Sequence, residues 1–118
     1  MEVVTTDEFL AWYDGIDESQ ADAVTRYVGL LEQAGVALGH PYSSAIEGSR
    51  YALRELRVQA SGQPVRVFYA FDPRRDAVLL IGGDKTGNHR FYEEFIPRAE
   101  KIWEQYLAEQ KAGKHEEE

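Results

Sequence analysis

Residues 50–90 read RYALRELRVQASGQPVRVFYAFDPRRDAVLLIGGDKTGNHR, and this stretch decides the fold. Three runs of strand-like composition, residues 51–59, 65–71 and 77–82, are separated by segments of turn-forming residues. Their spacing of about 9 to 12 residues, with hairpin turns between them, predicts an antiparallel meander. The last run is apolar almost throughout, which predicts a central strand with both faces covered.

The same window carries the positive charge of an otherwise acidic chain. It holds eight Lys/Arg and four Asp/Glu, a net charge of +4, whereas residues 1–49 carry −8 and residues 91–118 carry −4. The net charge of the whole chain, −8, argues against indiscriminate nucleic-acid binding, because the mean field repels polyanions. Screening over about 8 Å at physiological salt still leaves a local basic patch effective. We therefore expect the basic sheet to bind an anionic ligand.

Helical patterns precede the predicted meander. Residues 2–5 form a short strand candidate, and a capping box that begins at Thr5 opens a short helix over residues 6–14. The cap pattern repeats at Asp17, and an amphipathic stripe follows it as far as a C-cap at Gly35. These two helices are predicted to form an αα hairpin.

The remaining segments complete the element order. Residues 36–50 are rich in Gly, Pro and Ser and are predicted to be a loop, and a last helix spans about residues 90–110. Its apolar face continues across Pro97, which favours one kinked helix over two helices. The charged tail, residues 111–118, is predicted to be disordered. The sequence thus predicts a single α+β domain over residues 1–110, of order β-α-α-β-β-β-α, with an antiparallel sheet packed against the N-terminal αα hairpin and a C-terminal helix.

Composition excludes several classes of protein. The 118 residues include no cysteine, which excludes disulfides, thiolate catalysis and Cys-based zinc sites and is compatible with a reducing cytoplasm. No apolar run approaches the roughly 18 residues needed to cross a membrane, and we expect no signal peptide and no membrane partner. His40 and His115 have no supporting cluster, so we predict no metal site and no cofactor.

Three segments carry a family resemblance. They are residues 53–58 (LRELRV), 64–72 (PVRVFYAFD) and 79–92 (LLIGGDKTGNHRFY). Together with the element order, they resemble the RelE/HigB superfamily of small toxins from type II toxin–antitoxin systems. The chain is similar to the HigB-like branch, whose members often show an LRELR strand and a lysine just past the fourth strand. The resemblance covers about residues 1–110.

The resemblance implies a RelE-like fold and a cytoplasmic, metal-independent endonuclease that cleaves mRNA, often within the ribosome. It also implies a cognate antitoxin that silences the toxin in a hetero-oligomer, and many antitoxins of HigB type carry a helix-turn-helix domain. The superfamily also includes ParE-like members that act on DNA gyrase, so the fold alone does not establish the activity. A ParE-like inhibitor of a protein target and a catalytically degenerate, antitoxin-binding member remain open alternatives.

Metal-free RNA cleavage needs a base for the 2′-hydroxyl, positive charge for the phosphorane-like transition state and an acid for the leaving 5′-oxygen. Arginine suits the second role through bidentate contacts to phosphate, and Arg57 and Arg66 come from adjacent predicted strands. Lys85, past the next strand, suits a proton-transfer role if neighbouring arginines lower its pKa. His89 has an ordinary pKa near neutrality, although a surface position at a helix start competes with a catalytic role. These four are the predicted catalytic residues, and the identity of the base stays open.

Six further residues are predicted to contact RNA: Arg54, Tyr69, Arg74, Arg75, Arg90 and Tyr92. Arg54 lies on the opposite pleat from Arg57, so the two face one side only if a bulge intervenes. For the strand arginines, the alternative is a solvated sheet face with cross-strand pairs to Glu55 or Asp84. For Tyr69 the alternative is core packing, and for the two turn arginines it is solubility.

Overall fold

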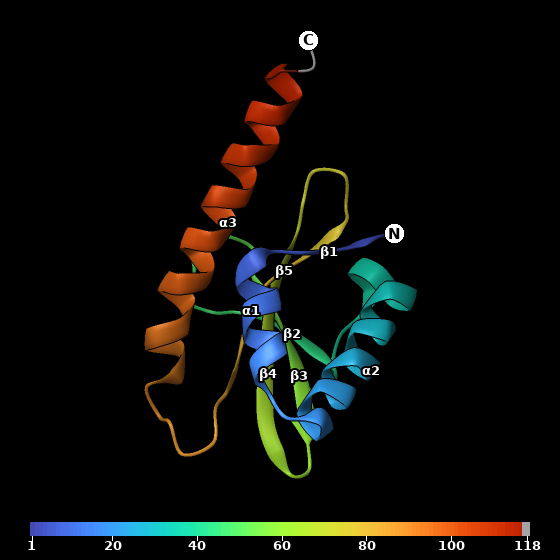
Figure 1. Cartoon of the computed structure of the whole chain (residues 1–118), viewed down its shortest axis with the longest axis vertical. Coiled ribbons are helices and arrows are strands. Elements are labelled where there is room, and N and C mark those ends of the chain that lie inside the picture. The colour runs from blue at the N-terminus through green and yellow to red at the C-terminus, as the bar shows by residue number, and fades with distance from the viewer. Residues whose placement is uncertain (117–118) are drawn as a thin grey trace.

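Five strands form one mixed sheet in the computed structural model, which describes residues 1–116 (Figure 1). Their order across the sheet is β1-β5-β4-β3-β2. The bounds are β1 Val3–Thr5, β2 Ser43–Ala45, β3 Arg54–Ala60, β4 Gln63–Phe71 and β5 Ala77–Asp84. The pairing of β3 with β4 and of β4 with β5 is antiparallel, which confirms the predicted meander and the α+β class.

Two edge strands differ from the prediction. β1 runs parallel to β5, with Val3 opposite Ala77, so the sheet is not wholly antiparallel. No hairpin links these two strands, because the αα hairpin and most of the meander lie between them in the chain. β2 lies inside the predicted loop and pairs antiparallel with β3. Its sequence, Ser-Ser-Ala, has no β-branched or aromatic residue, so its strand conformation follows from pairing with β3 and not from propensity.

The N-terminal helices are closed by side-chain and glycine caps. α1 is Asp7–Gly15, α2 is Glu18–Ala34 and the short 3₁₀ helix η1 is Gly35–Ala37. The N-cap of α1 is Thr6 and not the predicted Thr5, since the Thr6 hydroxyl accepts the Phe9 N–H at 3.1 Å while Thr5 ends β1. The predicted caps of α2 are confirmed: Asp17 accepts the Gln20 N–H at 2.8 Å, and Gly35 has a φ of 58°.

The C-terminal helix α3, Phe91–Glu116, is a single helix that contains Pro97. It continues past the predicted end at Gln110 and projects beyond the sheet (Figure 1). The final two residues of the predicted charged tail, 117 and 118, lie outside the described residues.

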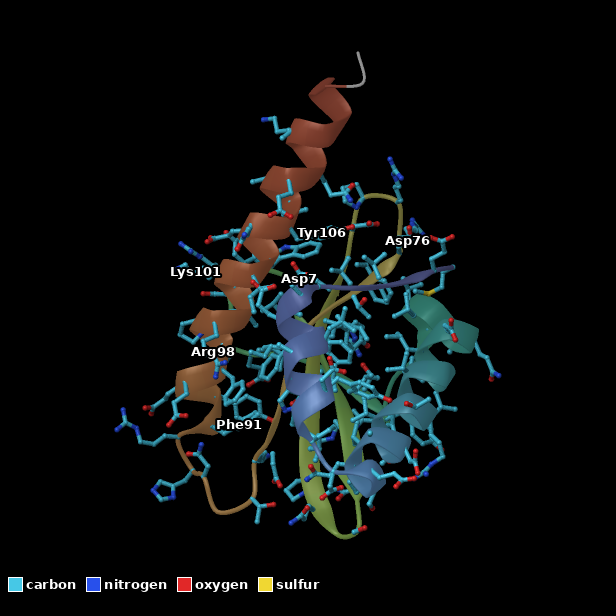
Figure 2. The ribbon with its side chains drawn as sticks, viewed as in Figure 1. Asp7, Asp76, Phe91, Arg98, Lys101 and Tyr106 are labelled. Carbon is cyan, nitrogen blue, oxygen red and sulfur yellow. The ribbon has the colours of Figure 1, made fainter. Side chains whose placement is uncertain are left out.

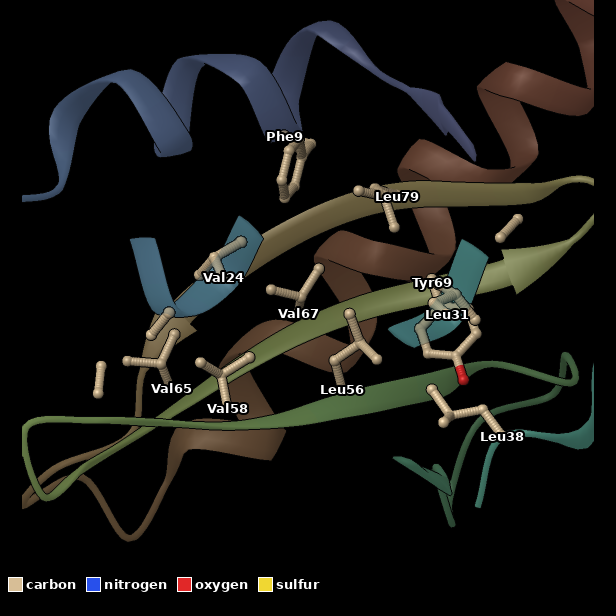
Figure 3. Close-up of a cluster of buried hydrophobic side chains, with 13 residues drawn as sticks. Phe9, Val24, Leu31, Leu38, Leu56, Val58, Val65, Val67, Tyr69 and Leu79 are labelled. Carbon is tan, nitrogen blue, oxygen red and sulfur yellow. The ribbon is translucent and has the colours of Figure 1, made fainter. Parts of the chain in front are cut away.

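Helices cover both faces of the sheet, and alternate strand residues point to one or the other. Val58, Val67 and Leu79 pack under α1 and α2 on what we call the hairpin face (Figure 3). Phe68 and Val78 pack against α3 on the α3 face. This alternation gives the chain two apolar layers, and β5 contributes to both, as predicted for a covered strand.

A register shift in β5 positions the end of that strand. Phe68 lies opposite Ile81 and Tyr69 lies opposite Leu79, so one extra residue is inserted in β5 and the faces exchange beyond it. A Cβ atom on Gly82 would lie 2.3 Å from the Trp12 ring, and one on Gly83 would lie 2.7 Å from the Phe95 ring. The two glycines therefore allow aromatic rings to close over both faces just before the chain leaves the sheet.

Candidate functional site

A buried carboxylate, Glu55, lies on the α3 face of β3 and is only 4% exposed. Its Oε1 atom accepts a hydrogen bond from the Tyr92 hydroxyl at 2.7 Å and lies 3.5 Å from Arg66 Nε. Its Oε2 atom accepts the Ser44 hydroxyl at 3.1 Å and lies 3.5 Å from Arg57 Nη1. We call these residues, with Lys85, the Glu55 cluster; its members are Ser44, Glu55, Arg57, Arg66, Lys85 and Tyr92.

Strand register brings the two arginines together. Arg57 on β3 lies directly opposite Arg66 on β4, and Glu55 lies two residues before Arg57 on the same face of the sheet. Like charges at opposed positions destabilise a sheet, so the Glu55 carboxylate between them offsets their repulsion. The predicted adjacency of Arg57 and Arg66 is confirmed.

The guanidinium of Arg66 is buried but incompletely bonded. Its side chain is 4% exposed, and its Nη1 donates to the Val65 carbonyl at 3.1 Å. Its Nε has no hydrogen-bond partner among the described residues, because the 3.5 Å approach to Glu55 is an ion pair without hydrogen-bond geometry. Buried charges are costly unless they are fully paired, so the Nε atom marks Arg66 as an incompletely satisfied buried charge.

Lys85 leaves the end of β5 and faces the cluster. Its backbone N–H donates to the Pro64 carbonyl at 2.9 Å, and its Nζ lies 5.0 Å from the centroid of the Tyr92 ring. Burial lowers the pKa of the Lys85 ammonium, and the charges of Arg66 and Arg57 lower it further, against an opposing effect of Glu55. A lysine with a lowered pKa gives up its proton more readily than an ordinary surface lysine.

The pKa of Tyr92 shifts in the opposite direction, upward. Burial raises the pKa of its phenol, and the hydrogen bond to Glu55 adds to that increase, while Arg66 opposes it. The hydroxyl therefore keeps its proton at neutral pH and acts as a donor, not as a base. Its ring is half-buried on the first turn of α3.

The cluster is positively charged and open to solvent on one side. Arg57, Arg66 and Lys85 against the single carboxylate of Glu55 give a formal charge of +2. A hollow of about 480 Å³ opens beside it, between the β2 segment and the start of α3. The residues that line it are His40, Ser44, Ala45, Ile46, Glu47, Glu55, Arg57 and Tyr92. Arg57 has 34% of its side chain exposed, so an anion in solution reaches the cluster there.

Two residues predicted to bind RNA lie on the other face of the sheet. Arg54 is on the hairpin face, where its Nε donates to the Ser43 hydroxyl at 3.2 Å and its Nη2 lies 3.4 Å from the Leu38 carbonyl. Tyr69 is completely buried there, and its hydroxyl bonds to Ser43. The bulge lies between β4 and β5, so it does not turn Arg54 toward Arg57. Neither residue joins the Glu55 cluster.

Other predicted residues lie at the surface. Arg74 and Arg75 are exposed in the β4–β5 turn, at the end of the sheet opposite Lys85. Figure 2 shows this separation, with Asp76 of the turn far from Phe91 at the start of α3. Arg90 is exposed and pairs with Glu93 at 3.0 Å. His89 is exposed on the loop between Lys85 and α3.

Glu55 and Ser44 are the members of the cluster that sequence analysis did not place in a site. Glu55 was considered only as an ion-pair partner of the arginines, although its position two residues before Arg57 puts both on one pleat. Asp84, the other predicted partner of the strand arginines, instead accepts a hydrogen bond from the Gln20 side chain at 3.3 Å. Ser44 gave no signal, because β2 was predicted as loop.

The part of the chain that the structure describes offers neither a cluster of metal ligands nor a membrane-spanning helix. Within residues 1–116, no group of three or more His, Cys, Asp or Glu side chains is arranged to hold a metal ion. No helix in the same part of the chain is both long enough and apolar enough to cross a membrane.

The fold and the Glu55 cluster define a small α+β protein with a cationic site on the α3 face of its sheet. The chain belongs to the family described as "Phage derived protein Gp49-like (DUF891)", whose model matches residues 11–104. Over 115 residues it is 36% identical to a Mycobacterium tuberculosis protein named "Putative toxin HigB3", covering 96% of this chain and 99% of that protein. Over 102 residues it is also 36% identical to "Putative toxin HigB2" of the same organism, covering 84% of this chain and 51% of that protein.

Proposed function

We propose that this chain is the toxin of a type II toxin–antitoxin module and acts as a metal-independent mRNA endonuclease of the RelE/HigB superfamily. The names of its two relatives support the toxin assignment. One observation carries the proposed chemistry: three cations, Arg57, Arg66 and Lys85, gather around the Glu55 carboxylate, and the partly exposed guanidinium of Arg57 opens onto a hollow. A phosphate oxygen is the kind of ligand that such a guanidinium binds.

The proposed reaction is an attack of the RNA 2′-hydroxyl on the adjacent phosphorus. The P–O bond to the 5′-oxygen breaks, which leaves a 2′,3′-cyclic phosphate on one product and a 5′-hydroxyl on the other. Arg57 and Arg66 stabilise the charge on the phosphate oxygens, a role for which one lost donor typically costs about 10²- to 10³-fold in rate. Lys85 is proposed to transfer one proton, and His89, on the loop that follows it, is the candidate for the second.

The proposed partners follow from the family resemblance. The toxin acts in the cytoplasm on mRNA, within the ribosome, and a cognate antitoxin with a helix-turn-helix domain silences it in a hetero-oligomer. A neighbouring reading frame that encodes a helix-turn-helix protein would support this arrangement, and co-purification of the two products would test it.

The activity is tested by tightly controlled expression, with growth and transcript integrity followed together. The expected result is growth arrest with cleaved transcripts, both relieved by Lys85→Ala. Unimpaired growth with intact transcripts would contradict the proposal. Because Lys85 is partly exposed in a loop, Lys85→Ala is expected to fold normally, which circular dichroism checks.

A second function is favoured by the net charge of −8, which is unusual for a protein directed at a polyanion. In this alternative the chain inhibits a protein target such as DNA gyrase. Inhibition of supercoiling by the purified protein, with RNA left intact, would select it. A degenerate member would be recognised by full tolerance of overexpression together with tight antitoxin binding.

A further inference from the structure

Glu55 links four elements of the fold through a single carboxylate. It lies on β3 and contacts Ser44 of β2, Arg66 of β4 and Tyr92 of α3. We propose that Glu55 is a positioning residue of the RNA-cleavage site: it holds Arg66 and Tyr92 in place and balances the positive charge around Lys85. This inference rests on the proposed function, and it assigns Glu55 no direct contact with RNA.

The geometry divides the carboxylate between two pairs of partners. Oε1 lies between the Tyr92 hydroxyl and Arg66 Nε, whereas Oε2 lies between the Ser44 hydroxyl and Arg57 Nη1. All four partners are donors, so an ionised carboxylate, which only accepts, satisfies every one of them. A glutamine would turn an N–H₂ group toward one of these pairs and face donor with donor. The arrangement therefore requires the charged residue and not only its shape.

Stability does not explain why a charge is kept here. Replacing a buried ion pair by apolar residues of similar volume is often neutral or stabilising. Glu55 and Arg66 are 4% and 3% exposed, and their 3.5 Å separation is long for a buried pair. Glu55 instead lines the open hollow, and Arg66 lies close enough to Lys85 to lower the pKa of its ammonium. A role in arranging the cations accounts for these features together.

The charged and titratable groups around Lys85 fix the sign of the electrostatic effect. Arg66 of β4 and Arg57 of β3 lower the pKa of Lys85, Glu55 raises it, and the Tyr92 ring of α3 lies against the ammonium. Removing the charge of Glu55 leaves the two arginines unopposed, so the pKa of Lys85 falls further. If neutral Lys85 accepts the 2′-hydroxyl proton, the acid limb of the rate profile then moves to lower pH.

The test compares Glu55→Gln with Asp72→Asn, which removes the charge of another buried carboxylate, 6% exposed, at the end of the sheet opposite Lys85. The chain is labelled with ¹³C at lysine Cε, Lys85 is assigned from the spectrum of Lys85→Arg, and its titration midpoint is measured. We expect Glu55→Gln to lower this midpoint by at least about 0.5 pH unit and Asp72→Asn to leave it unchanged. Single-turnover cleavage of RNA is expected to slow about tenfold or more in Glu55→Gln alone, with its acid limb displaced in the same direction.

The outcomes separate the two proposals. A wild-type chain that cleaves no RNA, but whose Lys85 midpoint falls in Glu55→Gln, contradicts the proposed function and supports the linkage between Glu55 and Lys85. A wild-type Lys85 midpoint and cleavage rate in folded Glu55→Gln overturns the role of Glu55. If Glu55→Gln does not fold, Glu55→Asp keeps the charge and shortens its reach. Slower cleavage with a nearly unchanged midpoint is then expected, and a wild-type rate overturns the proposal.

Discussion

The structure holds two buried carboxylates that each accept a hydrogen bond from a tyrosine of α3. Asp72 follows the end of β4 and accepts the backbone N–H groups of Arg74 and Asp76 at 2.9 and 3.0 Å and the Tyr106 hydroxyl at 3.2 Å. Glu55 lies within β3, opposite Phe68 of β4, accepts only side-chain donors and lies against two arginines.

The two carboxylates differ in which groups donate hydrogen bonds to them. Asp72 is satisfied by its own turn, so its bonds form whenever the β4–β5 hairpin forms. Glu55 needs β2, β3, β4 and α3 to be assembled, and even then the Arg66 Nε beside it has no hydrogen-bond partner within residues 1–116. A turn carboxylate of this kind serves the fold, whereas a carboxylate surrounded by cations at a hollow is suited to arranging a reaction site. Matched substitutions around Glu55 and around Asp72 test this distinction.

The largest expected difference is between two lysines. Lys85→Ala removes the proposed proton-transfer group, and we expect the rate of RNA cleavage to fall by about 10²- to 10⁴-fold with little change in unfolding free energy. Lys111 lies beside Asp72, and Lys111→Ala should leave both quantities unchanged. Single-turnover kinetics and urea unfolding of both variants provide the measurement. Equal rates for the two variants would remove Lys85 from the mechanism.

The second-largest difference in cleavage rate and stability is expected between the alanine variants of Arg66 and Arg74. Arg66→Ala deletes a proposed hydrogen-bond donor to the RNA phosphate and leaves the buried Glu55 carboxylate without its Arg66 partner. We expect cleavage to slow by about 10²- to 10³-fold and the free energy of unfolding to drop by about 3 to 5 kcal/mol. Arg74→Ala keeps the backbone N–H that Asp72 accepts, so its stability and rate should match wild type. Urea unfolding and cleavage assays check both, and a stable, fully active Arg66→Ala would contradict the functional reading of the cluster.

The two tyrosines provide a smaller contrast. Tyr92→Phe and Tyr106→Phe each delete a hydroxyl that donates to a buried carboxylate, so each should cost about 1 to 2 kcal/mol of unfolding free energy. Only Tyr92→Phe should also slow cleavage, by about tenfold, because only its hydroxyl holds Glu55. Thermal unfolding and kinetics distinguish the pair. A similar loss of activity in Tyr106→Phe would mean that stability alone sets the rate.

The smallest expected effect is on the stability of the protein at alkaline pH, and both Tyr92 and Tyr106 contribute to it. Burial raises the pKa of Tyr92 above the ordinary value of 10.0, and burial followed by the charge of Asp72 raises that of Tyr106. A raised folded-state pKa gives stability that is present below pH 10 and lost as the pH rises through the folded value. Each Tyr→Phe variant should therefore lose less stability than wild type between pH 10 and 12. Urea midpoints across that range test the sign, and a steeper alkaline loss in either variant would contradict it.

Much of the fold is predictable from local pattern, because β3, β4 and β5 alternate or continue their apolar residues and are joined by short turns. The adjacency of Arg57 and Arg66 and the separation of Arg54 also follow from pleat parity. The parallel direction of β1 and the existence of β2 are not predictable in this way, since both depend on pairing between segments that are distant in the chain.

The role of Glu55 in the cluster was harder to predict than the positions of the cations around it. Cations are conspicuous in a basic stretch of an acidic chain, but the role of Glu55 depends on three other segments reaching it. Ser44 arrives on a strand without β propensity, and Tyr92 arrives only because α3 packs across the sheet. Tyr69, which is predicted either to contact RNA or to pack in the core, is completely buried.

The chemistry of the RNA ends tests the central claim most directly. Transcripts from cells that express the chain are sequenced by a method that captures 2′,3′-cyclic phosphate ends. The account predicts new cyclic-phosphate ends with the wild-type chain and with Asp72→Asn, and none with Lys85→Ala. Absence of such ends in cells arrested by the wild-type chain, or their equal abundance with Lys85→Ala, would contradict it.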